Sequence, residues 1–284
     1  MKTESPLAKL LFSVIRMEVT APNYSGVGTA FVFSQNWKEG HAPFLVTAAH
    51  TVENAQHGRL FFTRSKEDKP VVGEYVCLEL DEFGKGWKKH PRPELDLAVL
   101  PLAPLVAQMQ EKGSTVYNTA LDESLLPGPA PDTGVDAVEE VMVAGFSAEI
   151  QDRLHLFPLV QKGVTANPFD VDFAKAPKFL VQLPICSGLA GSPVLVTRTF
   201  HQPTPQGLAT ATQIVLLGML TDVAVRQERS AAVFGPIPPL PAPGRADATW
   251  FPVGLAVKSS AISEVIGEFL KSIEAVQAPE PASK

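Results

Sequence analysis

The chain has 284 residues, of which 45% are hydrophobic and 19% charged, and its formal net charge is −6. This length suffices to bury one large core or two smaller ones. The acidic balance, with no basic arm or Arg-rich stripe, excludes a general nucleic-acid-binding surface, and no apolar run approaches the roughly 18 residues of a membrane span.

The apolar segments of the first hundred residues are short and separated by clusters of Gly, Pro, Asn and Asp. They are rich in Val, Phe, Leu and Thr and show no helical period. This pattern predicts an antiparallel meander or barrel. We expect strands at residues 13–19, 29–33, 44–47, 59–63, 74–80 and 97–100.

From about residue 104 to residue 139 Gln, Gly, Ser, Pro and Asp dominate, which predicts a linker with a short helix near residues 105–110. Strand patterns resume at residues 140–146, 179–183, 193–197 and 213–220. Apolar residues at steps of three and four then predict an amphipathic helix that begins at residue 259. The Pro- and Ala-rich tail is expected to fray.

Three motifs carry residues suited to acyl-transfer chemistry. His50 follows a strand in the run Phe44-Leu45-Val46-Thr47-Ala48-Ala49-His50, and Asp96 directly precedes the apolar run Leu97-Ala98-Val99-Leu100. An imidazole with a pKa of about 6.5 exchanges protons at physiological pH, and a carboxylate can fix its tautomer. A glycine-rich loop comes third: Gly188-Leu189-Ala190-Gly191-Ser192-Pro193.

These motifs, in this order, resemble the trypsin-like serine proteases of the chymotrypsin family. In that family the loop reads Gly-x-Ser-Gly-(Gly/Ser)-Pro, and Ala190 stands where the family has its nucleophilic serine. The resemblance implies an all-β fold of two antiparallel β-barrels of the chymotrypsin type with a C-terminal α-helix. The barrels would cover residues 8–104 and 140–258, joined by a linker at 105–139 and followed by a helix at 259–275 and a flexible tail at 276–284.

The resemblance also implies the roles of individual residues. His50 is the general base, Asp96 orients it, and the backbone N–H groups of Gly188 and Ala190 form the oxyanion hole. Thr221 stands where the family has a serine whose hydroxyl contacts the triad carboxylate, and the residues after it, Asp222 and Val223, lie on the edge that pairs with substrate. The other nearby nucleophiles lie too far from the nucleophile position along the loop: Cys186, Ser187 and Ser192.

Departures from the family bear on specificity and activation. The expected substrate pocket has Pro184 as its floor, Val223 in its wall and Gly254 on its far side. Because none of these is acidic, we expect small or medium uncharged residues, such as Ala, Val or Leu, before the scissile bond. Leu189 replaces the aspartate of activated trypsinogens, so we expect no zymogen switch of that kind.

Two further features bear on location and regulation. The only cysteines, Cys77 and Cys186, are far apart in the sequence, and the N-terminus lacks the features of a secretory signal, so we expect a cytoplasmic protein. The Pro-rich residues 234–244 lie between Thr221 and Gly254. They are expected to form either a lid or docking arm beside the pocket or a stiff polyproline surface loop.

Two functions follow. The first is a serine endopeptidase disabled by alanine at position 190, and the alternative is a natural pseudoprotease that binds peptides or partners. The persistence of His50, Asp96 and Gly188 favours the disabled enzyme. The expected partners are a protein or peptide substrate and, as one means of restraint, a regulatory protein. No cofactor, metal, nucleic acid or membrane is expected.

Overall fold

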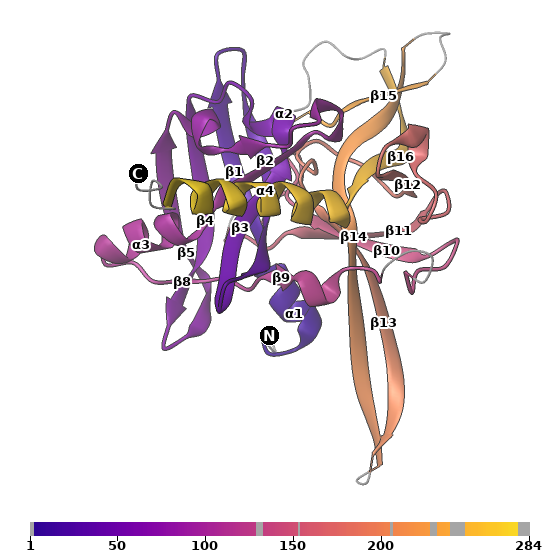
Figure 1. Cartoon of the computed structure of the whole chain (residues 1–284), viewed down its shortest axis with the longest axis horizontal. Coiled ribbons are helices and arrows are strands. Elements are labelled where there is room, and N and C mark those ends of the chain that lie inside the picture. Colours follow the sequence, from indigo (N-terminus) through magenta and orange to yellow (C-terminus); the bar gives the residue numbers. More distant parts are fainter. Residues whose placement is uncertain are drawn as a thin grey trace, which may run out of the picture.

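Two sheets, one from each half of the chain, dominate the computed structural model, which describes residues 3–128, 133–152, 154–204, 207–227, 232–238 and 248–277. The sheets lie side by side, and the C-terminal helix crosses the first of them (Figure 1). The predicted all-β class, with two largely antiparallel sheets and a C-terminal helix, is confirmed.

The first sheet has the strand order β5-β4-β1-β2-β3-β7-β6, and β8 and β9 pair with β4 and β2. Over the described residues this path stays open between β5 and β6. The strands are β1 (Val14–Ala21), β2 (Tyr24–Trp37), β3 (Gly40–Ala48), β4 (His57–Lys66), β5 (Lys69–Asp81), β6 (Lys88–Lys89), β7 (Leu97–Pro101), β8 (Val116–Tyr117) and β9 (Leu121–Asp122).

The second sheet has the order β13-β10-β11-β12-β16-β14-β15, and an additional pairing of β13 with β14 closes six of its strands into a ring. The two closing strands also form a long hairpin that projects from the molecule (Figure 1). The strands are β10 (Glu140–Gly145), β11 (Leu159–Thr165), β12 (Lys178–Gln182), β13 (Pro193–Thr204), β14 (Gly207–Gln227), β15 (Val233–Pro236) and β16 (Ala248–Lys258).

The central strands of the first sheet are buried on both faces, which explains why they are continuous apolar runs in the sequence. Along β2, Ala30 and Val32 belong to a core within the first half of the chain. The alternate residues Phe31 and Phe33 belong to a larger core shared with the second half. Side chains of a strand point to opposite faces in turn, so one strand serves both cores.

The helices are α1 (Pro6–Leu11), α2 (Ala49–Val52), α3 (Ala103–Glu111) and α4 (Ser259–Gln277). The region predicted as a linker, residues 105–139, contains most of α3 and the two short strands β8 and β9, which extend the first sheet. Within the described residues no helix is long and apolar enough to cross a membrane.

Helix α4 fastens the end of the second half onto the first sheet. Its apolar face is buried, and the ring of Phe269 packs edge-on against Phe44 of β3, with 5.6 Å between ring centroids. The indole N–H of Trp37 donates to the carboxylate of Glu274 at 3.0 Å. The predicted tail falls mainly on residues 278–284, which lie outside the described residues.

Candidate active site

Strand pairing in the first sheet brings His50 and Asp96 together. His50 lies in the short helix α2 directly after β3, and Asp96 directly precedes β7. Ala48 pairs with Leu97 across β3 and β7, and the Ala49 N–H donates to the Asp96 carbonyl at 3.0 Å. Asp96 ends a 3₁₀ turn in the left-handed conformation, with φ 50°, which turns the chain into β7.

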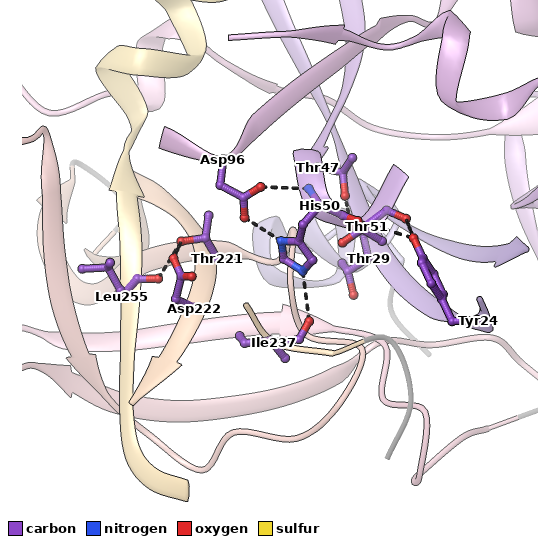
Figure 2. A network of polar contacts seen from close by, with 10 residues as sticks. All are labelled: Tyr24, Thr29, Thr47, His50, Thr51, Asp96, Thr221, Asp222, Ile237 and Leu255. Carbon is purple, nitrogen blue, oxygen red and sulfur yellow. Dashed lines mark hydrogen bonds and ion pairs between the residues drawn. The ribbon is translucent and has the colours of Figure 1, made fainter. Parts of the chain in front are cut away.

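The Asp96 carboxylate makes two contacts with His50 (Figure 2). One oxygen lies 2.5 Å from the imidazole Nδ1, and the other accepts the backbone N–H of His50 at 2.8 Å. A carboxylate held in this way fixes the ring orientation and keeps a proton on Nδ1. The imidazole Nε2 is thereby directed away from the first sheet.

His50 Nε2 donates to the carbonyl of Ile237 at 3.0 Å (Figure 2). Both ring nitrogens thus face oxygen atoms, and the imidazole donates to both of them only in its doubly protonated form. Burial acts most strongly on the His50 pKa and lowers it. The hydrogen bond and charge of Asp96, the Ile237 carbonyl and the charge of Asp222 together outweigh burial, so the pKa is raised above its ordinary value.

The glycine-rich loop is held against the first sheet by Thr29 of β2. The Thr29 hydroxyl donates to the Gly188 carbonyl at 2.9 Å and accepts the Phe146 N–H at 2.8 Å. The Thr29 N–H donates to the Ala190 carbonyl at 3.3 Å. Both loop glycines have positive φ, and a Cβ on Gly191 would strike the Thr29 carbonyl oxygen, so this close approach requires glycine.

The Gly188 N–H, predicted as an oxyanion donor, donates to the carbonyl of Pro238 at 3.0 Å. His50 contacts the carbonyl of the preceding residue, Ile237. Adjacent Cα atoms are about 3.8 Å apart. The structure therefore brings the imidazole of the first half and the loop amide of the second half to one dipeptide.

The Thr221 hydroxyl does not contact its expected partner, the carboxylate of Asp96. Two acceptors lie within reach of its single proton, Asp222 Oδ2 at 2.7 Å and the Leu255 carbonyl at 3.1 Å, and the described contacts of the hydroxyl do not include Asp96 (Figure 2). Thr221 is fully buried, so its hydroxyl must bond within the protein, and these contacts connect β14 to β16 and orient Asp222.

The sequence predicts Asp222 only on the edge that pairs with substrate, and the structure also brings its carboxyl near His50 and Asp96. Burial raises the pKa of this carboxyl, and the nearby charge of Asp96 raises it further, although the Thr221 hydroxyl and the charges of Lys178 and His50 act in the opposite direction. A second carboxylate thus faces the His50–Asp96 pair. Its position next to Thr221 was the available signal.

The predicted pocket residues do not all converge. Val223 is fully buried and pairs with Gly254, so these two lie together. An ideal Cβ on Gly254 would lie 2.7 Å from Leu220 Cδ1 and 3.0 Å from Ile185 Cδ1. Pro184 is exposed and lines a surface depression with other residues of that edge, so it does not form a buried floor.

The site brings together an imidazole–carboxylate pair and a loop amide, with a methyl group at position 190. No protein-family model and no curated protein matches the chain. Among solved structures, an HtrA-type protease with a tripeptide is 15% identical (TM-score 0.47), and the serine endoprotease from Yersinia pestis is 11% identical (TM-score 0.46).

Both of these matches cover 93% of this chain, which spans 62% and 65% of their chains, less than two thirds of each. An inactivated protease paralogue from the scabies mite is 14% identical, with a TM-score of 0.46, over 93% of this chain and 96% of its own.

Proposed function

We propose that the chain is a trypsin-like serine endopeptidase that is inactive because alanine stands at its nucleophile position, Ala190. The observation that carries this proposal is the shared dipeptide: the imidazole of His50, paired with Asp96, and the amide of Gly188 meet consecutive carbonyls. A base and an oxyanion donor that serve one reaction must likewise both reach the backbone of one bound peptide.

The chemistry follows from these positions once a hydroxyl replaces a hydrogen of the Ala190 methyl group. His50 takes the hydroxyl proton as the oxygen attacks a substrate carbonyl, and Asp96 stabilises the imidazolium that forms. The amide groups of Gly188 and residue 190 stabilise the oxyanion. His50 then returns the proton to the leaving amine, and water releases the acyl group by the same sequence of steps.

Substrate is expected to bind as an extended strand beside β14 at Asp222 and Val223. The side chains that surround Gly254 are aliphatic, namely Leu220, Ile185 and Val181. An Arg or Lys before the scissile bond would lose its hydration there without an acidic partner. We therefore propose a preference for uncharged aliphatic residues at that position.

The test is turnover by the Ala190→Ser protein on a library of unstructured peptides, with the cut sites read by mass spectrometry. We expect cleavage after uncharged aliphatic residues by Ala190→Ser and none by the unaltered chain. Adding His50→Ala should abolish turnover, because triad members act as a unit. A folded Ala190→Ser protein that cleaves nothing would favour the alternative, a peptide-binding pseudoprotease.

One observation favours the pseudoprotease: Ala190 is buried and belongs to the larger apolar core, so a methyl group fits at this position.

For either function we propose a cytoplasmic location, which the two free thiols of Cys77 and Cys186 support. A regulatory protein partner remains part of the proposal, since an unrestrained protease would endanger its own compartment.

A further inference from the structure

The edge of β14 that would pair with a substrate already carries a strand of the same chain. β15 runs antiparallel to it, with Val233 opposite Val225, Gly235 opposite Val223 and Pro236 opposite Asp222. The pairing continues beyond β15, because the Ile237 N–H donates to the Thr221 carbonyl at 3.3 Å. The described part of the Pro-rich region, residues 234–238, thus lies in the site and is not a surface loop.

The two residues that end this segment use the groups proposed for catalysis. The Ile237 carbonyl accepts from His50 Nε2 and the Pro238 carbonyl accepts from the Gly188 N–H, both at 3.0 Å. An imidazolium that donates to Ile237 holds the proton that a general base would have to accept from a nucleophile. The segment therefore lies along β14 and favours the protonated form of His50.

The side chain of Ile237 is buried completely, within the apolar core that includes Leu189, Ala190 and Val223. Farther along the segment Val233 is exposed, and Phe234 is partly exposed with its ring packed edge-on against Phe173 at 5.6 Å between centroids. One side chain of the segment is thus inserted into the site while the outer ones face solvent, which is how a peptide strand anchors in a groove with a single specificity pocket.

We propose that residues 233–238 act as an internal pseudosubstrate of the proposed protease, and that the groove accepts an extended apolar peptide with a branched aliphatic residue in place of Ile237 when this segment leaves. The inference rests on the proposed function for the term substrate. Binding itself requires no chemistry at position 190.

Intramolecular occupancy predicts a measurable competition. A ligand that needs the open groove binds with its intrinsic affinity reduced by the fraction of molecules that are open. If the segment occupies the groove in about 90–99% of molecules, its release tightens the apparent affinity about 10- to 100-fold. Ile237→Asp should release it, because a carboxylate in an apolar core without a partner is strongly disfavoured.

The experiment measures binding of a fluorescein-labelled peptide, Val-Phe-Gly-Pro-Ile-Pro, by anisotropy to the full chain with Ala190 in place. We expect Ile237→Asp to bind at least tenfold more tightly than the unaltered chain. Leu208→Asp is the matched control, since it places the same charge on the exposed far end of the β13–β14 hairpin. The same peptide with Asp in place of its Ile should bind to neither protein.

A second measurement does not depend on any variant. Hydrogen exchange of the unaltered chain should quicken at residues 232–238 when the unlabelled peptide is added to saturation, because the segment is displaced from β14. The proposal is overturned if a folded Ile237→Asp protein binds the peptide no more tightly, if no protein binds it, or if exchange in this segment is unchanged at saturation. If Ala190→Ser cleaves peptides in those cases, the proposed protease function still holds and only the pseudosubstrate proposal fails. If the peptide binds as expected but Ala190→Ser cleaves nothing, only the proposed protease function fails.

Discussion

At the scale of the residue, His50 is a base whose surroundings favour its charged form. Burial alone would lower its pKa, but Asp96, the Ile237 carbonyl and Asp222 together raise it above the ordinary value. A raised pKa in the folded state means that His50 contributes stability at pH values below its unfolded pKa of about 6.5. This contribution is lost as the pH rises through the folded-state pKa.

We therefore expect the imidazole of His50 to titrate above pH 6.5 in NMR spectra of the folded chain, with the resonance assigned by its loss in His50→Ala. Asp96→Asn should lower the midpoint, because the amide accepts a hydrogen bond but carries no charge. Deprotonation also leaves Nε2 and the Ile237 carbonyl as two acceptors, so the protection of residues 232–238, after correction for the intrinsic pH dependence of amide exchange, should fall over the same pH range. A midpoint at or below 6.5 would contradict the imidazolium described here.

At the scale of the element, one threonine of β2 connects the two halves of the site. The Thr29 hydroxyl joins the Gly188 carbonyl to the Phe146 N–H, and both bonds are buried. Thr29→Val keeps the shape and removes both bonds, which leaves a buried donor and a buried acceptor unpaired. We expect the free energy of unfolding to fall by about 1–3 kcal/mol for each group left unpaired.

Urea denaturation measures this change. Thr29→Ser is the matched control, since it retains the hydroxyl and loses only a methyl group. Its free energy of unfolding should fall by about 1 kcal/mol. Equal losses in the two variants would show that the hydroxyl does not carry the connection.

The elements that the sequence predicts best are those that a short, local pattern of apolar residues identifies. Residues 44–47 and 97–100 are recognisable as strands because both faces are apolar, and His50 and Asp96 are recognisable because each directly adjoins one of these strands. The position of Asp96 opposite Ala49 follows from that pairing. These parts depend on short-range signals that survive in a single sequence.

Other elements depend on contacts between distant segments. β15 could not be predicted, because Pro236 and Pro238 disfavour a strand and its partner on β14 is what gives it a ladder. The contacts of the Thr221 hydroxyl with Asp222 and Leu255 depend on the alignment of β14 with β16, which shifts register at this point. The exposure of Pro184 likewise depends on how β12 ends beside Pro252.

At the scale of the whole molecule, the site exists only where the two halves meet. The first sheet supplies the imidazole and its carboxylate, the second supplies the loop amide and the strand edge, and α4 returns from the second half to pack on the first. A peptide bound beside β14 can therefore meet all of these groups only in the assembled fold. The internal segment already spans this junction, from β14 to His50 and Gly188.

The most direct test of the account is covalent labelling of the Ala190→Ser protein by a peptidyl phosphonate with a branched aliphatic residue at its reactive end, followed by intact-mass and fragment mass spectrometry. We expect one adduct, on the residue introduced at position 190, that forms faster when Ile237→Asp is also present and is abolished by adding His50→Ala. A folded Ala190→Ser protein that forms no adduct, with or without Ile237→Asp, would contradict it.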